Sequence, residues 1–252
     1  MIYYLDIILF INSINNTMSN QNNIINSAIA TGIAEMMTLP ICTIKTNYQN
    51  TNSTSMYQTI KNIYNQGSIQ AFYRASPAAI ISQIFSTSSK YFLYRWFEKQ
   101  NIPYSNKISN GLMSGIISSL LTHPIDTIKI HLQMNASFKN EFTIHGPRLL
   151  YRGYSKTFSK TAIGSCLFFP IYDKIYENIG NSLTASMMSA IISTTIMQPL
   201  DYLKTRHIYG LSLYQGYNIK YYYKGLFLNL FRIVPHFMIV MTTIDYLNKK
   251  ID

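Results

Sequence analysis

A short pattern built on a proline and a lysine recurs three times along this chain. The three copies read LPICTIKTNYQ at 39–49, HPIDTIKIHLQ at 123–133 and QPLDYLKTRHI at 198–208. Each copy ends a largely apolar segment, and an aromatic-basic pair then precedes a second apolar segment; these pairs are Tyr73-Arg74, Tyr151-Arg152 and Tyr223-Lys224. A threefold internal repeat constrains the fold strongly, because each copy must be read as one and the same supersecondary unit.

The apolar segments indicate helices that cross a membrane. Only 12% of the residues are charged, against about a quarter in an ordinary soluble domain. Long uncharged runs cover 75–89, 108–125, 161–172, 181–200 and 233–244. The mean hydropathy of +0.05 is too low for helices that face lipid on every side, so polar faces must line an interior. We predict an all-α membrane protein with six transmembrane helices, in three pseudo-symmetric two-helix repeats around a central cavity.

The repeats divide the chain into an N-terminal extension at 1–22 and units at 23–100, 101–178 and 179–252. The first residues hold an apolar stretch that is too short to span a membrane and lacks the basic region of a secretory signal. Met18 is an alternative start. A soluble helical repeat protein is the alternative fold.

Charge and cysteine content narrow the function. Lys and Arg number 21 against 10 Asp and Glu, a net charge of +11, which favours lipid headgroups, nucleic acid or a phosphorylated solute as partner. Two cysteines without a CxxC motif predict neither a disulfide framework nor a metal site. The sequence contains no P-loop, no GxGxxG and no catalytic constellation. We therefore expect no cofactor and no enzymatic activity.

The repeats resemble those of the mitochondrial carriers, whose signature P-x-[DE]-x-x-[KR] is followed by an aromatic-basic-Gly motif. The resemblance covers roughly residues 23–250. It implies a monomeric carrier of a small solute in the mitochondrial inner membrane. The many Asn, Ile, Tyr, Lys and Phe residues, whose codons are AT-rich, suggest a divergent member such as those of AT-rich parasites or giant DNA viruses.

By this resemblance, the signature residues form a ring of ion pairs that closes the matrix side. It implies the pairs Asp126–Lys204 and Asp201–Lys45. Cys42 occupies the acid position of the first repeat, so we expect Lys129 to lack its partner and the gate to have two bridges. Gln49 and Gln133 match the bracing glutamines of the family, while the third repeat has Ile208 there. The alternative, juxtamembrane charges that set topology, explains the lysines but not the acids.

The family's cytoplasmic ring is degenerate in this sequence. Its acid positions hold Arg95, Asp173 and Asp245, and the first base position holds Glu98. None of the family's pairs can form as written, although Arg95 could bridge to Asp173 or Asp245. A weak outer ring would favour the state that is open to the cytoplasm.

The resemblance also places three solute contact points, each nine residues after the motif's aromatic residue: Ser82, Lys160 (followed by Thr161) and Arg232. A charge near the bilayer centre costs roughly 3 kcal/mol or more, which makes both cations functional candidates. Glu35 could pair with Lys160 or Arg232, or handle a proton. Lys90 and His236 would extend the basic surface.

We predict that the solute is an anion, with nucleotides or deoxynucleotides favoured by the positive charge and the abundant tyrosines. The third repeat reads KTRHIY where ADP/ATP carriers have RRRMMM, which argues against an orthodox ADP/ATP exchanger. The alternatives are a carboxylate or phosphate carrier, a carrier-fold scaffold that does not transport, and a basic nucleic-acid-binding protein. Arg74, Arg152 and Lys224 are candidate sites for membrane lipid, cardiolipin in particular.

Overall fold

Six long helices dominate the protein. The computed structural model describes residues 20–51, 55–99 and 107–249, so most of the predicted extension at 1–22, with Met18, lies outside the described part. The long helices are α2 (Asn20–Asn50), α5 (Ser76–Lys99), α6 (Lys107–Gln133), α8 (Tyr154–Ile179), α9 (Ser182–Tyr209) and α10 (Leu226–Lys249). We call α2, α6 and α9 the odd helices, because each opens a repeat, and α5, α8 and α10 the even helices.

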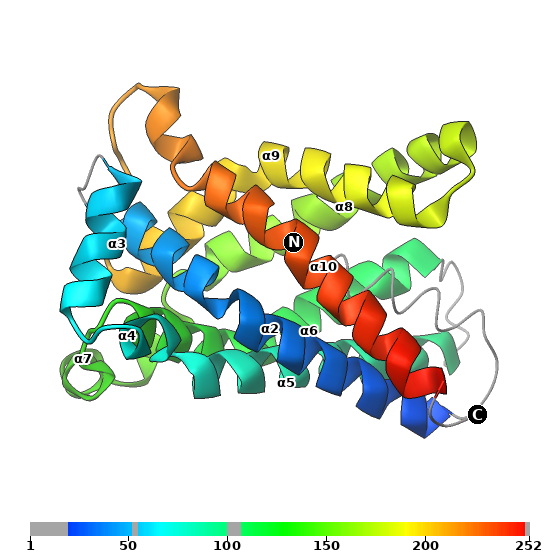
Figure 1. Cartoon of the computed structure of the whole chain (residues 1–252), viewed down its shortest axis with the longest axis horizontal. Coiled ribbons are helices and arrows are strands. Elements are labelled where there is room, and N and C mark those ends of the chain that lie inside the picture. The colour runs from blue at the N-terminus through cyan, green and yellow to red at the C-terminus, as the bar shows by residue number, and fades with distance from the viewer. Residues whose placement is uncertain (1–19, 52–54, 100–106, 250–252) are drawn as a thin grey trace.

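The six helices form a closed ring. Each packs on the next along the chain, and α10 packs back on α2; Figure 1 shows α10 crossing α2. The three odd helices also contact one another. Each of them contains a proline, at Pro40, Pro124 and Pro199, and a proline inside a helix removes a backbone hydrogen bond and favours a kink. All six predicted helices are therefore present, paired in the predicted order.

Short helices connect the long ones at one end of the ring. They are α3 (Met56–Asn65), α4 (Gln70–Tyr73), α7 (Phe138–His145), η1 (Gly146–Tyr151) and η2 (Ile219–Tyr223), and α3, α4 and α7 gather at the left of Figure 1. By the resemblance this is the matrix end. In the described residues, the first repeat has the α-helices α3 and α4 in this connection, the second has α7 and η1, and the third has the 3₁₀ helix η2.

The distribution of polarity is inverted relative to a soluble protein. Among the described residues, more buried side chains are polar or charged than hydrophobic, whereas large hydrophobic side chains such as Met37, Phe92 and Phe231 are exposed. An apolar exterior around a polar interior suits a bundle in lipid. By length and composition, one described stretch, Ala28–Asn50, is a candidate membrane span. The buried polar faces lower the hydropathy of the other long helices.

The aromatic-basic-Gly motif makes the turn into the even helices of the second and third repeats. Gly153 and Gly225 have φ values of +80° and +85°, which L side chains rarely adopt. A Cβ on Gly153 would also lie 3.1 Å from the backbone nitrogen of Ile208. In the first repeat the position is Ala75, which is not among the described residues with positive φ. The chain therefore enters α5 through a different turn.

In the second and third repeats, the side chain before the proline of the odd helix bonds to the backbone just before the even helix. His123 Nε2 donates to the carbonyl of Arg152 at 3.1 Å, and Gln198 Nε2 donates to the carbonyl of Lys224 at 3.1 Å. Both bonds tie an odd helix to the start of its own even helix. Leu39 occupies this position in the first repeat and is fully buried instead.

Candidate functional site

A small polar cavity lies among all six long helices. Its volume is about 120 Å³, below the roughly 300 Å³ at which small-molecule pockets begin. The lining includes every cation predicted for the matrix gate and the contact points: Lys45, Lys129, Lys160, Lys204 and Arg232. These cations form ion pairs with three buried carboxylates, and a cavity of this volume is too small for a large solute.

Two carboxylates are paired as the sequence predicts. Asp126 on α6 accepts from Lys204 Nζ at 3.1 Å, and Asp201 on α9 pairs with Lys45 on α2. Each aspartate also binds a predicted contact point with its other oxygen. Ser82 Oγ donates to Asp126 Oδ1 at 2.6 Å, and Lys160 donates to Asp201 Oδ1. The predicted gate and the predicted contact points are therefore bonded to one another.

The third carboxylate belongs to Glu35 on α2, which is fully buried. Lys129 Nζ on α6 lies 2.5 Å from Glu35 Oε1, and Arg232 on α10 pairs with Oε2. Lys129 lacks its family partner, as expected, because Cys42 occupies that position, but it pairs with Glu35 instead. The structure therefore has a third ion pair beside the two that were expected. Of the two partners suggested for Glu35, Arg232 pairs with it, whereas Lys160 pairs with Asp201.

The three acids make equivalent contacts. Each binds a lysine from the next odd helix with one oxygen and a contact point on the preceding even helix with the other. We call this arrangement the carboxylate ring, and its acids are Glu35, Asp126 and Asp201. The sequence signal for the third acid was the spacing of Glu35 and Cys42, since residues seven apart share a helix face.

The remaining predicted contact residues lie around the ring. His236, one turn beyond Arg232, is buried, and its Nδ1 lies 3.4 Å from Thr38 Oγ1. Arg232 Nε reaches the same hydroxyl at 3.4 Å. Thr161 is not among the lining residues; its hydroxyl donates to Thr157 of the same helix, and its methyl group lies beside Gly115. Thr161 therefore faces α6, which corrects its assignment to the solute site.

The two predicted bracing glutamines hold helices rather than ion pairs. Gln133 Oε1 accepts from Thr46 Oγ1 at 2.8 Å, which links α6 to α2. Gln49 Nε2 donates to the carbonyl of Lys224 at 3.1 Å. In the third repeat, Ile208 is fully buried beside Gly153.

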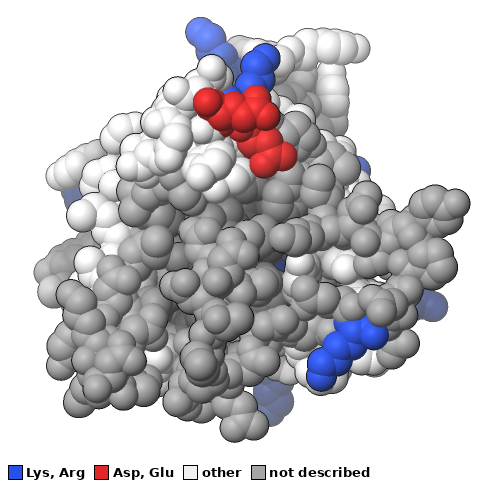
Figure 2. All heavy atoms as spheres, turned by 90° about the vertical axis from the view of Figure 1, so that its right-hand side faces the viewer, with Lys and Arg blue, Asp and Glu red and all other residues white. Residues whose placement is uncertain are grey.

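The opposite end of the molecule is only partly described. The side chains of Arg95, Glu98 and Asp245 lie outside the described residues, so the bridges suggested for Arg95 remain predictions. Asp173 is exposed on α8, as is Glu177 one turn further on. Figure 2 shows acidic side chains gathered on one part of this face, with Lys or Arg beside them.

The motif cations lie at the ends of neighbouring helices. Arg152 Nε donates to the carbonyls of His207 and Ile208 at 3.2 and 3.0 Å, at the end of α9. Lys224 Nζ donates to the carbonyl of Thr51 at 2.7 Å, just after α2. Positive charge at a helix C-terminus is stabilising. Arg74 instead reaches back to the carbonyl of Gln66 in its own repeat at 3.3 Å.

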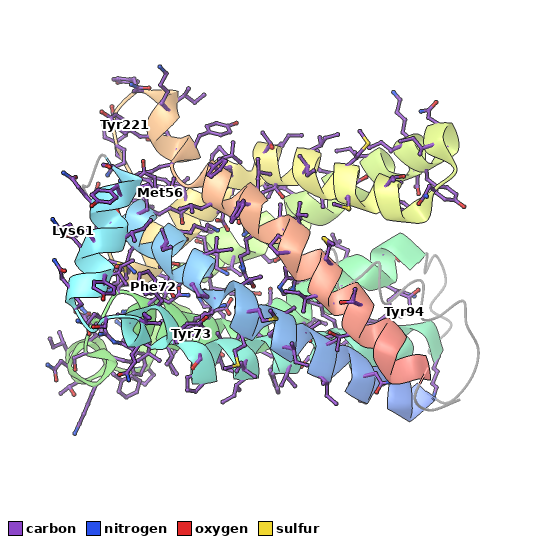
Figure 3. All side chains as sticks on the ribbon, in the orientation of Figure 1. Met56, Lys61, Phe72, Tyr73, Tyr94 and Tyr221 are labelled. Carbon is purple, nitrogen blue, oxygen red and sulfur yellow. The ribbon has the colours of Figure 1, made fainter. Side chains whose placement is uncertain are left out.

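Lys224 also lines a groove between the first and third repeats. The groove has a volume of about 580 Å³ and includes Tyr48, Met56 and Tyr221; Figure 3 labels Met56 and Tyr221 at the same end of the molecule. Burial, and then the nearby charge of Arg206, lower the pKa of Lys224 to about 8. A bound anion would favour the charged form of this lysine.

The sequence is similar to those of mitochondrial carrier proteins. A family profile described as "Mitochondrial carrier protein" matches residues 16–104 and 100–182. A mitochondrial carrier-like protein of Acanthamoeba polyphaga mimivirus is 62% identical over 233 residues, which is 92% of this chain and 98% of the relative. A mitochondrial substrate carrier family protein of Dictyostelium discoideum is 25% identical over 86% of this chain and 91% of its own length. A mitochondrial arginine transporter of Arabidopsis thaliana is 24% identical over 67% of this chain and 66% of its own length.

Proposed function

Because the chain belongs to the mitochondrial carrier family, we propose that it exchanges anionic solutes across the mitochondrial inner membrane by alternating access. Nucleotides or deoxynucleotides are the favoured cargo. The family is one of membrane transporters, and the relatives are named as carriers or transporters of different solutes, arginine and glycine among them. Family membership therefore gives transport, and the choice of solute depends on the residues of the cavity.

The charge of the cavity carries the argument for an anion. Five cations line it and three acids are paired with them, and five minus three leaves a net charge of +2 among the described residues. Lys90, buried on α5, adds to the positive charge of the interior. Unbalanced positive charge in a low-dielectric interior attracts an anion.

Two of these cations supply the contacts for the solute. Lys160 and Arg232 each hold a ring carboxylate in the closed state. A phosphate or carboxylate group of a solute offers oxygens of the same kind, and the guanidinium of Arg232 can bind them in a bidentate manner. A solute anion would therefore replace Asp201 and Glu35 at these two side chains.

Nucleotide cargo is supported by the overall charge of +11 and by the 21 tyrosines, since aromatic side chains can stack on a base. The relative from a DNA virus adds a context in which nucleotides are needed for genome copying. Exchange of a triphosphate for a diphosphate would respond to the membrane potential, at about 2.3 kcal/mol per charge and 100 mV.

A phosphate or dicarboxylate carrier is the second candidate. The net charge of +2 equals the charge that a doubly ionised phosphate or dicarboxylate would neutralise, and the cavity of about 120 Å³ suits a small solute better than a nucleotide. The pair Lys160-Thr161 resembles the basic-plus-polar pair associated with carboxylate substrates in this family. Against a carboxylate, Thr161 does not line the cavity beside Lys160. The non-transporting scaffold was suggested by the degenerate matrix and cytoplasmic rings. Three acids are paired with the lysines of the matrix ring, which favours transport, whereas the cytoplasmic ring stays degenerate in sequence.

Uptake into liposomes tests the proposal. Purified protein would be reconstituted, the vesicles preloaded with ADP, phosphate or a dicarboxylate, and entry of labelled nucleotides and deoxynucleotides measured. We expect uptake that needs an internal nucleotide, that falls at least tenfold with Arg232→Gln, and that survives Lys139→Gln, which removes an exposed charge on α7. Exchange of phosphate or carboxylate alone would favour the second candidate. No exchange of any solute would favour the scaffold.

We also propose that the groove beside Lys224 binds an anionic lipid phosphate, with cardiolipin as the candidate. The lowered pKa of Lys224 and the start of α10 in the groove support this. Cardiolipin should raise the melting temperature of the protein in detergent, neutral lipid should not, and Lys224→Met should reduce the difference. An equal effect of both lipids would argue against the site.

A further inference from the structure

We propose that Glu35 is the third acid of the matrix gate, moved two helical turns from the position that Cys42 now occupies. The gate role of this acid rests on the transport function proposed above, whereas its pairing with Lys129 does not. The consequence is a gate in which all three acids, Glu35 included, bind both a gate lysine and a solute contact point.

The position from which the acid is missing now holds a thiol. Cys42 is buried, packs with Leu39 and Ala79, and lines the cavity together with Lys129, so this position offers the lysine no carboxylate. Glu35 lies seven residues earlier on the same face of α2, about 10 Å along the axis at 1.5 Å per residue. Lys129 therefore extends away from the position of Cys42, toward the other end of the bundle.

The contacts of Glu35 distinguish a gate acid from a simple counter-ion. A counter-ion of Arg232 alone would leave Lys129 with no acid, and a buried lysine without one is costly. Instead Lys129 lies 2.5 Å from one oxygen of Glu35 while Arg232 holds the other. This is the same division of oxygens as in Asp201, whose two partners are also on the next odd helix and the preceding even helix.

The displacement changes how the gate would open. A solute anion at Arg232 competes directly with Glu35, and one at Lys160 competes with Asp201. Ser82, the contact point bonded to Asp126, is neutral and offers no such competition. Binding of the solute would therefore loosen two of the three acids, and the gate would stay closed when the cavity is empty.

A double-mutant cycle on the empty protein tests the pairing without any solute. The variants are Glu35→Gln, Lys129→Gln and their combination, with the melting temperature in detergent as the readout. We expect the combined loss to be clearly smaller than the sum of the single losses. The matched control is Glu35→Gln with Lys204→Gln, whose lysine pairs with Asp126, and here the losses should add. Additive losses in the first cycle would overturn the pairing.

Restoring the family's acid gives a second test of the pairing. Cys42→Asp places a carboxylate at the ring position of the first repeat, within the range of Lys129 if that lysine turns back. It should recover part of the stability lost in Glu35→Gln, and recover none in the Lys129→Gln background. Equal effects in both backgrounds would argue against a shared role of the two positions. If Glu35→Gln fails to fold, the double variant Glu35→Lys with Lys129→Glu, which exchanges the two charges, replaces it. We expect this double variant to have a higher melting temperature than Lys129→Glu alone.

Labelling of Cys42 tests the gate role. In a Cys166→Ser background Cys42 is the remaining cysteine, and a membrane-impermeant maleimide would be applied to the face that carries α3 and α7. Without solute, Glu35→Gln should raise the labelling rate on the order of tenfold, while Glu177→Gln, an exposed acid at the other end, should not. If the labelling rate did not change while the double-mutant cycle showed that Glu35 and Lys129 interact, the pairing would stand and the gate role would be overturned. A raised rate in a protein that transports no solute would support the gate and count against the proposed cargo exchange.

Discussion

Four positions of the first repeat show how its differences from the second and third repeats are accommodated locally. Cys42 stands where Asp126 and Asp201 stand, and Glu35 supplies the acid instead. At the other three positions, Leu39 replaces a hydrogen-bonding side chain and Ala75 replaces a left-handed glycine. Arg74 keeps the cation but bonds within its own repeat rather than to a neighbouring helix. The comparison teaches that the ring depends on a carboxylate at a suitable face and depth, rather than on one sequence position.

The largest expected effect comes from removing the acids one at a time. Glu35→Gln and Asp201→Asn each leave two buried cations without an acid, and Asp126→Asn leaves one. We expect losses of about 5 kcal/mol for the first two and about 3 kcal/mol for Asp126→Asn, seen as a ranked drop in melting temperature. If Glu35→Gln cost much less than Asp201→Asn, the equivalence of the repeats would fail.

The second largest loss of stability is expected when a glycine with positive φ is replaced. Gly225→Ala should cost about 2 kcal/mol, because φ is +85° and the new Cβ would lie 3.2 Å from Gln49 Cγ. The reciprocal change Ala75→Gly should cost less than about 1 kcal/mol. Circular dichroism on thermal unfolding would compare the two. Similar costs would mean that the first repeat makes the same turn.

Substitutions before the proline sharpen the comparison further. Gln198→Leu copies Leu39 into the third repeat and removes one bond to the carbonyl of Lys224 and one from Asn229. We expect a loss of about 1–2 kcal/mol. The matched control is Leu39→Met, which should cost below about 1.5 kcal/mol. Stabilisation by Gln198→Leu would show that this polar tie is not needed.

The smallest effect is expected for the motif cations. Arg152→Met should cost about 1 kcal/mol, because Arg152 caps the end of α9 through two carbonyls. Arg74→Met should cost less than about 0.5 kcal/mol, since its contact is exposed. Equal losses in the melting temperature would indicate that Arg74 also acts between repeats.

Much of the fold followed from the sequence because its signals are local. Prolines, uncharged runs and aromatic-basic pairs predicted six helices in the right order, and the three-residue spacing of Asp126 and Lys129 placed acid and base on one face. The pairs Asp126–Lys204 and Asp201–Lys45 were implied by the resemblance to the carriers, and both are present. The assignment of Thr161 failed because its direction depends on how α8 rotates against α6.

What the sequence by itself determined is the repeat, the family and the set of charged residues that the interior holds. What only the tertiary structure decided is which carboxylate each cation reaches. A lysine side chain can extend along its helix in either direction, so Lys129 had two regions within range. Packing of α2 against α6 and α10 placed Glu35 between Lys129 and Arg232, and a buried charge binds the opposite charge that the packing brings within reach.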